Sequence, residues 1–537
     1  MRRRVPLIAL AVATAASLFP LSSAGARTLP GAAAPGAEAV ASGAAGKPSS
    51  IAWAPCTDFP PEITGVECGT LKVPVDWDRP RGATIDLALA RRKATDPAAR
   101  IGSLVINPGG PGGSGVDFVG YAEGYFTEEV TRRFDIVGFD PRGVARSSPV
   151  VCSAELLRTA PYPILRSEAE FNAFRTFARK LHKDCRARTG PVFDHVDSGS
   201  VAEDIDAIRA AVGDEKLSYY GISYGTLMGQ MYAEKFPRKI RSMVLDSNMD
   251  HSLGIKDFID TEAAAAQDSF DEFVAWCERE EACALHGRDI RAFWADLLAR
   301  ADRGELAFPD DPDYKLTQLD VIGLAFGAFY GPAWGPLAEV LVALDTGEEP
   351  PAGELTRFLR AKAAEPVELA YLPDQVFCED YRLPVRNYRE YAEHLRRSAR
   401  IAPDMRLSPP ATVLTAICLG QEAPIPNPQH RLDVDGAPPL LLGNALHDPA
   451  TAYPWAVNAA RQIGREATLI TYEGWGHGIY GRGDCPTAAI DRYLVSRNVP
   501  PNAITCPAIP PAEARTLSRP SLPQRPGPYP NLPAWGF

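Results

Sequence analysis

The sequence lacks the patterns that mark several common classes of protein. It contains no C-x-x-C and no H-E-x-x-H motif, both frequent in zinc sites, so no metal centre is predicted. Its formal net charge is −11, and without a basic stripe to replace phosphate counterions we expect no nucleic acid as a partner. After residue 26 no run of eighteen apolar residues occurs, so no membrane span is predicted.

The composition is that of an ordinary globular protein, but the chain is long. Hydrophobic residues make up 45% and charged residues 23% of its 537 residues, which is typical of a folded, soluble protein. This length exceeds that of one ordinary domain. We therefore expect a core with a large insertion or a second domain.

The first 26 residues have the three parts of an export signal. Arg2-Arg3-Arg4 supplies positive charge, residues 5–21 are apolar, and Ala24-Gly25-Ala26 fits a cleavage site between small residues. No cysteine precedes Cys56, which argues against a lipid anchor at the cleavage point. The sequence therefore predicts a secreted, extracellular protein.

Two further segments at the ends have a composition that disfavours a packed core. Residues 27–50 consist mainly of Ala, Gly, Pro and Ser and are expected to form a flexible leader or propeptide. Residues 507–537 are rich in proline and are expected to form a tail.

The 10 cysteines agree with an oxidising compartment. An even count does not establish connectivity, but the cysteines fall into neighbouring pairs along the chain. This arrangement favours five sequential disulfides: Cys56 with Cys68, Cys152 with Cys185, Cys277 with Cys283, Cys378 with Cys418, and Cys485 with Cys506.

The most informative segment is a G-x-S-x-G sequence, Gly221-Ile-Ser-Tyr-Gly225. It follows an aromatic and β-branched strand that starts at Leu217, and it leads into a helical run at residues 226–236. Strand, tight turn and helix in this order form the nucleophile elbow of α/β-hydrolases. Glycine is expected there because the turn needs unusual backbone angles and a substrate carbonyl must approach closely. Ser223 is the predicted nucleophile.

The sequence around this elbow alternates between helical and strand patterns. Ser200 and Glu203 form a capping-box signature that predicts a helix over residues 201–212, and residues 240–245 predict a buried strand. This rhythm is typical of a parallel sheet. Further strands are predicted at residues 84–91, 103–107, 134–139, 439–443 and 467–472.

Between residues 251 and 436 the pattern is mostly helical, with helices predicted at residues 268–277, 289–301, 319–344 and 355–364. We therefore predict an α/β-hydrolase fold, with a mostly parallel sheet, helices on both of its faces and a largely helical cap insertion. The predicted divisions are a hydrolase core at residues 51–250 and 437–506 and a cap at residues 251–436.

A nucleophilic serine needs a base and an orienting acid, which follow it in this fold at the tips of later strands. Asp448 follows the strand at residues 439–443, and His477, in Gly474-Trp-Gly-His-Gly478, follows the strand at residues 467–472. With 8 histidines in the whole chain, a histidine at this position is informative, and we predict it as the general base. Asp448 is the predicted acid, Asp246 is the rival acid, and His447 is expected to be a neighbour only.

A second glycine-rich segment, Asn107-Pro-Gly-Gly-Pro-Gly-Gly-Ser-Gly115, follows a strand. Such a loop can direct a backbone N–H at an oxyanion, and we predict an oxyanion hole formed by the amides of Gly110 and Tyr224. The same loop also matches the G-x-G-x-x-G pattern of dinucleotide-binding proteins. The export signal, the cysteine pairs, the interposed proline and the hydrolase set elsewhere argue against that alternative.

These motifs, with Asp140-Pro-Arg-Gly143, resemble those of the secreted actinobacterial tripeptidyl aminopeptidases, relatives of the proline iminopeptidases. Pro108 stands where the iminopeptidases usually carry histidine, which places the chain on the tripeptidyl side. The resemblance spans residues 53–506. It implies an α/β-hydrolase fold, a cap over the site, no cofactor, and removal of short peptides from the free N-termini of peptide substrates.

An exopeptidase of this kind must bind the α-ammonium group, and a buried cation requires a carboxylate partner. Glu379 and Asp380, beside Cys378, are the candidates, although ordinary surface charge is the alternative for both. Two other functions remain open: an esterase or lipase with the same triad, and a catalytically silent binding protein on a hydrolase scaffold. The sequence does not indicate an oligomeric state.

Overall fold

The computed structural model describes residues 50–307, 314–349, 368–421, 424–499 and 503–511. The predicted export signal, the leader up to residue 49, the helix predicted at residues 355–364 and residues 512–537 of the tail lie outside these ranges. Within them, no helix has the length and apolar character needed to cross a membrane.

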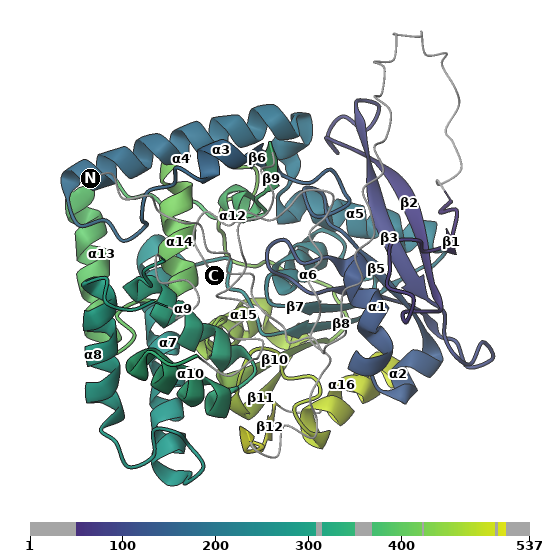
Figure 1. Ribbon diagram of the computed structural model, residues 1–537. Coiled ribbons are helices and arrows are strands. Elements are labelled where there is room, and N and C mark those ends of the chain that lie inside the picture. The colour runs from purple at the N-terminus through teal and green to yellow at the C-terminus, as the bar shows by residue number, and fades with distance from the viewer. Residues whose placement is uncertain (1–49, 308–313, 350–367, 422–423, 500–502, 512–537) are drawn as a thin grey trace.

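The main sheet has ten strands, in the order β1-β2-β3-β5-β4-β7-β8-β10-β11-β12 (Figure 1). The strands at one edge, from β1 to β5, pair antiparallel, whereas all pairs from β5 to β12 are parallel. The mostly parallel sheet predicted from the sequence is confirmed. The strands are β1 (Ala54–Pro55), β2 (Val66–Pro74), β3 (Thr84–Arg92), β4 (Gly102–Asn107), β5 (Phe134–Phe139), β7 (Leu217–Ile222), β8 (Ile240–Asp246), β10 (Leu440–His447), β11 (Ala467–Trp475) and β12 (Ile504–Cys506).

Helices cover both faces of this sheet because successive side chains of each central strand point to opposite sides. In β7, Leu217 and Tyr219 pack into one hydrophobic cluster, and Tyr220 packs into the other. The first cluster includes α5 (Ser198–Ala211), α6 (Tyr224–Lys235) and α15 (Tyr453–Ile463), and the second includes α1 (Gly115–Tyr125), α2 (Glu128–Arg133) and α16 (Asp484–Ser496). This arrangement is the predicted α/β-hydrolase fold.

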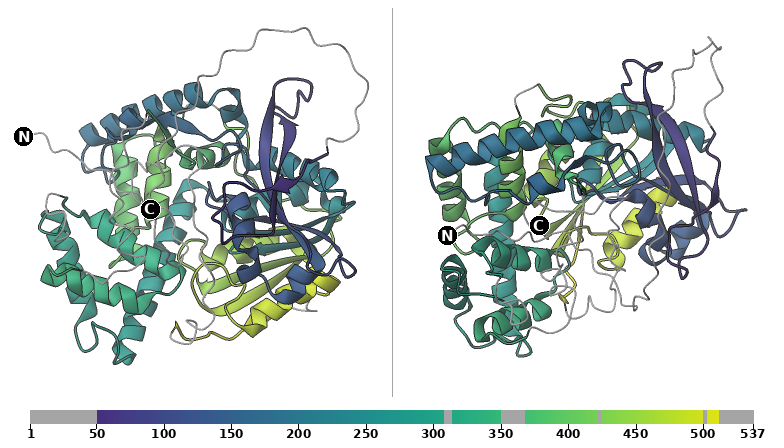
Figure 2. Two further views of the ribbon diagram at one scale, coloured as in Figure 1. Left: turned by 45° about the vertical axis from the view of Figure 1, so that its right-hand side comes forward. Right: turned by 45° about the horizontal axis from the view of Figure 1, so that its top comes forward.

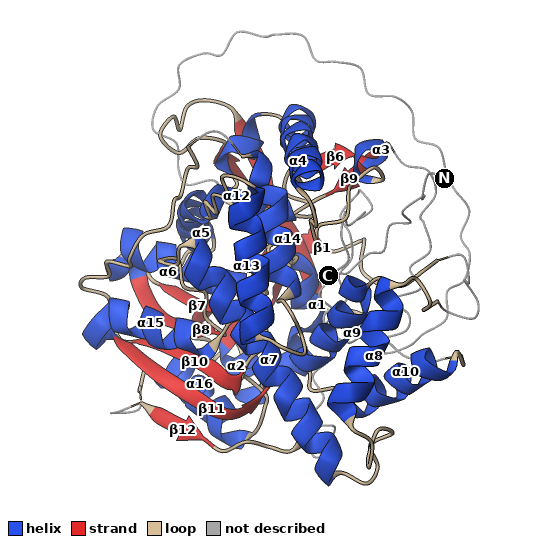
Figure 3. Ribbon diagram, turned by 90° about the vertical axis from the view of Figure 1, so that its left-hand side faces the viewer, coloured by secondary structure: helices blue, strands red, loops and turns tan. Residues whose placement is uncertain are grey.

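The chain between β8 and β10 forms a mostly helical layer, which we call the cap (Figure 3). The long helix predicted at residues 319–344 is two helices, since Gly331 and Pro332 interrupt it. The elements of the cap are α7 (Ile255–Arg279), α8 (Ile290–Asp302), α9 (Gln318–Tyr330), α10 (Trp334–Thr346), β9 (Leu369–Tyr371), α12 (Asp374–Asp380), α13 (Tyr388–Ile401), α14 (Pro409–Ile417) and η3 (Cys418–Gly420).

A segment from the first half of the chain packs on the cap, although the sequence predicted it within the core. β6 (Val151–Ser153) pairs antiparallel with β9, and α4 (Glu168–Thr189) lies against α13 and α14 (Figure 2). This segment also contains α3 (Ala154–Leu157) and η1 (Pro191–His195). Long-range pairing of this kind leaves no local pattern in the sequence. The remaining short helices are η2 (Pro237–Lys239) and η4 (Gly464–Glu466).

The start of α5 differs from the prediction. The N-cap residue is Asp197, whose side chain accepts a hydrogen bond from the Ser200 N–H at 2.9 Å. The predicted capping box of Ser200 and Glu203 is therefore wrong, and Glu203 forms an ion pair with Lys235 instead. Aspartate and serine are equally good N-cap residues, so the local sequence did not indicate whether the helix begins after Asp197 or after Ser200.

All five predicted disulfides are confirmed, and the described part of the chain has no free cysteine. Cys378–Cys418 joins two segments of the cap, and Cys152–Cys185 joins β6 to α4. Disulfides of this density are typical of proteins that fold in an oxidising compartment.

Candidate active site

Ser223 lies at a tight turn between β7 and α6. Its backbone has φ of +57° and ψ of −125°, a region that costs energy for a residue with a side chain. Its N–H donates to the carbonyl of Asp246, at the end of the next strand, at 3.0 Å. The turn is thus a strained strand-to-helix connection with a serine at its tip, which is the geometry of a nucleophile elbow.

The two glycines of the elbow serve close packing and not unusual backbone angles. Neither Gly221 nor Gly225 has a positive φ. A Cβ on Gly221 would lie 2.5 Å from the Gly225 carbonyl oxygen, and one on Gly225 would lie 2.8 Å from the Asn107 carbonyl oxygen. The expectation that the glycines supply the strained angles is therefore wrong, because Ser223 itself adopts them.

The structure brings Asp448 and His477 together. Asp448 follows β10 and His477 follows β11, so both lie at the carboxyl edge of the sheet. The Asp448 oxygens lie 2.9 Å and 3.1 Å from His477 Nδ1. Asp448 also accepts hydrogen bonds from the N–H groups of Ala450 and Thr451.

The charge of this buried carboxyl is stabilised by its partners. Burial by itself raises the pKa of Asp448, but His477 and the two backbone N–H donors hold it below the usual value for aspartate. An ionised Asp448 at Nδ1 favours the histidine tautomer that leaves Nε2 free to accept a proton.

Ser223 and His477 lie at the same sheet edge but are not hydrogen-bonded to each other in the described chain. Catalytic hydrogen bonds are often long without substrate, so this does not remove either residue from the site. The His477 N–H donates to the Tyr330 carbonyl at 2.9 Å, and the Tyr330 ring contacts the imidazole edge to face at 5.0 Å. The cap therefore contacts the histidine directly.

Asp246, the rival acid, has other partners. Its carboxylate accepts the N–H groups of Ile479 and Tyr480 at 2.7 Å and 3.0 Å, and the Tyr220 hydroxyl at 2.7 Å. None of these atoms belongs to the His477 ring. Asp246 therefore joins the serine turn to the loop that carries the histidine.

His447 precedes Asp448 in the chain, but the partners of its side chain are other residues than Ser223, Asp448 and His477. It pairs with Asp268 of α7 at 2.8 Å and stacks on Trp475, whose indole N–H donates to Glu272 of the same helix. The pKa of His447 is raised by Asp268, although burial opposes this. His447 thus connects α7 of the cap with the loop that carries Asp448.

The predicted oxyanion loop lies against the elbow. A Cβ on Gly109 would lie 2.8 Å from the Tyr224 nitrogen, and Gly109 has φ of +84°, so glycine is required here. The Gly109 N–H is already donated to Asn107 Oδ1 at 2.9 Å. The N–H groups of Gly110 and Tyr224, the predicted donors, make no hydrogen bond within the described chain.

Glu379 and Asp380 lie on α12, and the surface-charge alternative is wrong because both are buried. Asp380 accepts hydrogen bonds from Ser198, Tyr224 and Asn427. Burial and the charge of Asp197 raise its pKa to about 7. Burial and the charge of Asp194 raise the pKa of Glu379 to about 8. Their role in binding an ammonium group stays a prediction.

Sequence analysis missed Thr451, Tyr330 and Glu262. Thr451 donates its hydroxyl to Asp448 at 2.9 Å, and its place three residues after an aspartate was a usable signal for a turn. Glu262 of α7 is 2% exposed, and burial with the nearby charge of Asp448 raises its pKa to about 8. Glu262 and Tyr330 come near Asp448 and His477 only because the cap folds onto the core, so neither residue has a local signal in the sequence.

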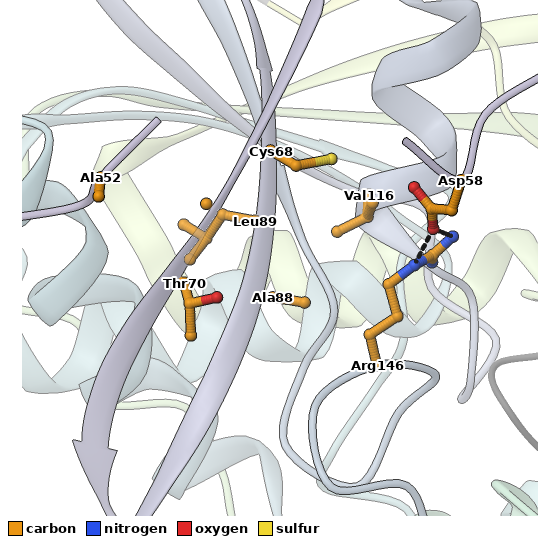
Figure 4. A pocket seen from close by; sticks show the side chains of 9 residues that line it. Ala52, Asp58, Cys68, Thr70, Ala88, Leu89, Val116 and Arg146 are labelled. Atoms are coloured by element: carbon orange, nitrogen blue, oxygen red, sulfur yellow. Dashed lines mark hydrogen bonds and ion pairs between the residues drawn. The ribbon is translucent and has the colours of Figure 1, made fainter. Parts of the chain in front are cut away.

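A surface hollow of about 440 Å³ lies elsewhere, at the antiparallel edge of the sheet (Figure 4). Arg146 and Asp58 form an ion pair beside it, and Thr70, Ala88 and Leu89 contribute to its lining. Ser223, Asp448 and His477 are not among its lining residues, so this hollow does not describe the catalytic site. Within the described chain, no cluster of three or more histidines, cysteines or acids could hold a metal ion.

Comparison with known proteins agrees with this fold. A model of the alpha/beta hydrolase fold matches residues 102–316, and a model described as TAP-like protein matches residues 409–506. The chain is 32% identical to the serine protease Hip1 of Mycobacterium tuberculosis, over 85% of this chain and 91% of the relative.

Two further relatives have the same identity. The tripeptidyl aminopeptidase of Streptomyces lividans is 32% identical over 82% of this chain and 83% of its own. A carboxylesterase B of Mycobacterium tuberculosis is 32% identical over 84% of this chain and 89% of its own. The chain therefore belongs to the tripeptidyl aminopeptidase family of α/β-hydrolases, as its motifs predicted.

Proposed function

We propose that the protein is a secreted serine exopeptidase that releases short peptides, tripeptides in particular, from free N-termini. The observation that carries the proposal is the geometry at the carboxyl edge of the sheet, where a strained Ser223 and the hydrogen-bonded pair of Asp448 and His477 all follow parallel strands. The relatives named as a serine protease and as a tripeptidyl aminopeptidase support the peptide substrate. The five disulfides and the export signal predicted at residues 1–26 support secretion.

In the proposed mechanism, Ser223 Oγ attacks the carbonyl carbon of the scissile peptide bond. His477 Nε2 takes the serine proton and gives it to the leaving amine, while Asp448 stabilises the imidazolium. The amides of Gly110 and Tyr224 stabilise the oxyanion. Water, deprotonated by His477, then attacks the acyl-enzyme and releases the peptide, and the proton returns to Ser223.

To cleave at a fixed number of residues from a free N-terminus, the enzyme needs a carboxylate that binds the α-ammonium of the substrate. Three residues in extended conformation span about 10 Å, so this carboxylate must lie about that far from Ser223. Asp380 is occupied by three protein donors. The charged neighbours of Glu379 are Asp194, Asp380, Asp197 and Arg186, and none of them belongs to the predicted catalytic set.

Glu262 fits this requirement better. It accepts one hydrogen bond, from the Ser408 hydroxyl at 2.6 Å, and forms no ion pair within the described residues. Its electrostatic partners include Asp448 and Tyr330, which belong to the surroundings of His477. We therefore assign the ammonium to Glu262. Binding of the cation would lower the pKa of this carboxyl, which would release its proton to solvent and become the carboxylate partner.

A panel of chromogenic mono-, di- and tripeptide amides tests the proposal, each with a free and with an acetylated N-terminus. The expected result is rapid hydrolysis of the free tripeptide amide, little hydrolysis after acetylation, and no activity of the Ser223→Ala variant. Equal hydrolysis of free and acetylated peptides would contradict the exopeptidase assignment.

An esterase is the second candidate function, since the relative named carboxylesterase B is as similar to this chain as the peptidases are. The acyl-transfer chemistry is the same for esters and amides. Efficient hydrolysis of acyl esters together with inactivity on every peptide amide of the panel would favour it.

A further inference from the structure

One segment of the cap contacts both halves of the predicted oxyanion hole. This segment is residues 371–380, from the end of β9 through α12. On one side, the Tyr371 hydroxyl donates to the Gly112 carbonyl at 3.2 Å. Pro373 packs so closely on Gly112 that a Cβ there would lie 2.4 Å from the proline Cβ. The loop carrying Gly110 is therefore held from the cap.

On the other side, the same segment holds the residue after the nucleophile. The Tyr224 hydroxyl donates to Asp380 Oδ2 at 2.5 Å, and its ring packs on Phe377 at 6.3 Å. Tyr224 is 1% exposed. Because its backbone N–H is the second predicted oxyanion donor, a fixed side chain also restrains the direction of that donor.

Asp380 is itself anchored to the core. Its carboxylate accepts the Ser198 N–H at 2.9 Å and the Ser198 hydroxyl at 2.8 Å, at the start of α5. It also accepts the Asn427 side-chain amide at 2.6 Å, and Cys378–Cys418 ties α12 to η3. The segment is thus a rigid bridge and not a loose covering.

We propose that Tyr371 and Asp380 are positioning residues of the oxyanion hole, so that residues 371–380 set the separation of the Gly110 and Tyr224 N–H groups. The inference rests on the proposed serine mechanism. Oxyanion donors must lie within about 2.7–3.1 Å of the oxygen, and preorganised donors cost no rearrangement during the reaction. A displaced donor therefore lowers kcat more than it raises KM.

The test uses Tyr371→Phe, Tyr224→Phe and Asp380→Asn in the full-length protein. Tyr391→Phe is the matched control, since the Tyr391 hydroxyl also donates from the cap to a backbone carbonyl, that of Pro163. Each variant is assayed for hydrolysis of p-nitrophenyl acetate and for inhibition by a simple alkylboronic acid, which forms a tetrahedral adduct on serine.

Tyr371→Phe and Tyr224→Phe should each lower kcat roughly tenfold. This is less than the roughly 10²–10³-fold loss expected when an oxyanion-hole donor is removed, because the donor is only displaced. KM should stay within about twofold, and the inhibition constant of the boronic acid should rise by the same factor as kcat falls. The losses of Tyr224→Phe and Asp380→Asn should be less than additive in the double variant, because both substitutions weaken the same Tyr224–Asp380 hydrogen bond. Tyr391→Phe should leave kcat unchanged.

Wild-type kcat in both tyrosine variants would overturn the proposal, as would an equal loss in Tyr391→Phe or a loss explained by a lower melting temperature. These outcomes differ from failure of the serine mechanism itself. In that case the wild-type protein would neither hydrolyse the ester nor react with a fluorophosphonate probe at Ser223.

Discussion

The carbonyl of Asp246 accepts the N–H of Ser223 at 3.0 Å. The carboxylate of the same aspartate accepts two N–H groups of the loop that follows His477. One residue at the end of β8 therefore fixes both the nucleophile turn and the histidine loop, although it does not contact the imidazole.

Asp246→Asn and Asp448→Asn should consequently fail in different ways. Asp448→Asn should remain folded and lose about 10⁴-fold in kcat, because the wrong histidine tautomer is favoured. Asp246→Asn should lose about 2 kcal/mol of unfolding free energy, since charge-assisted hydrogen bonds are removed. Thermal unfolding and kcat, measured together, check this; a stable, inactive Asp246→Asn variant would reverse the roles.

Ser223→Ala should abolish turnover and leave the fold intact. A loss of roughly 10⁴-fold or more is expected for the nucleophile of a triad. The side chain caps no hydrogen bond of α6, so its removal should not lower the melting temperature. A folded variant that keeps a tenth of the wild-type activity would refute the elbow assignment.

Glu262→Gln should raise KM for a free tripeptide amide about 10–100-fold, the equivalent of a hydrogen bond to a charged group. Hydrolysis of p-nitrophenyl acetate, which has no amine, should stay near that of the wild type. Glu379→Gln is the comparison variant, with a second buried carboxyl on α12. If Glu379→Gln raises KM and Glu262→Gln does not, the substrate ammonium binds to α12, as the sequence predicted.

The stability of the protein should depend on pH through Glu262. Its folded-state pKa is raised from 4.5 to about 8, so between these values the unfolded chain has released a proton that the folded chain keeps. The stabilisation is therefore complete below about pH 4.5 and is lost as pH rises towards 8. The melting temperature of Glu262→Gln minus that of the wild type should therefore be several degrees larger at pH 8 than at pH 5. For the exposed Glu339→Gln, this difference should be the same at both pH values.

Two disulfides should differ in their effect on catalysis when each is removed in its own double variant. Replacing Cys378 and Cys418 by serine should cost about 2–4 kcal/mol and also lower kcat, because α12 carries Asp380. Replacing Cys485 and Cys506, which join α16 to β12, should cost stability alone. Calorimetry and ester hydrolysis of the two double variants check this, and equal effects on kcat would show that the cap disulfide does not act on the site.

The sequence by itself determined the features whose causes are local. The alternation of strand and helix patterns indicated the parallel sheet, and the spacing of the cysteines indicated the five pairs. The elbow around Ser223 and the order of Asp448 and His477 were predictable because each residue directly follows a strand, and parallel strands bring their carboxyl ends to one edge.

Only the tertiary structure decided which partners those residues have. Asp448 and Asp246 both follow strands, but the hydrogen bond to His477 Nδ1 belongs to Asp448. The contacts of Asp380 with Tyr224 and Tyr371 with Gly112 join residues more than 150 positions apart. Such contacts arise from the folding of the cap on the core, so no local period or spacing in the sequence could specify them.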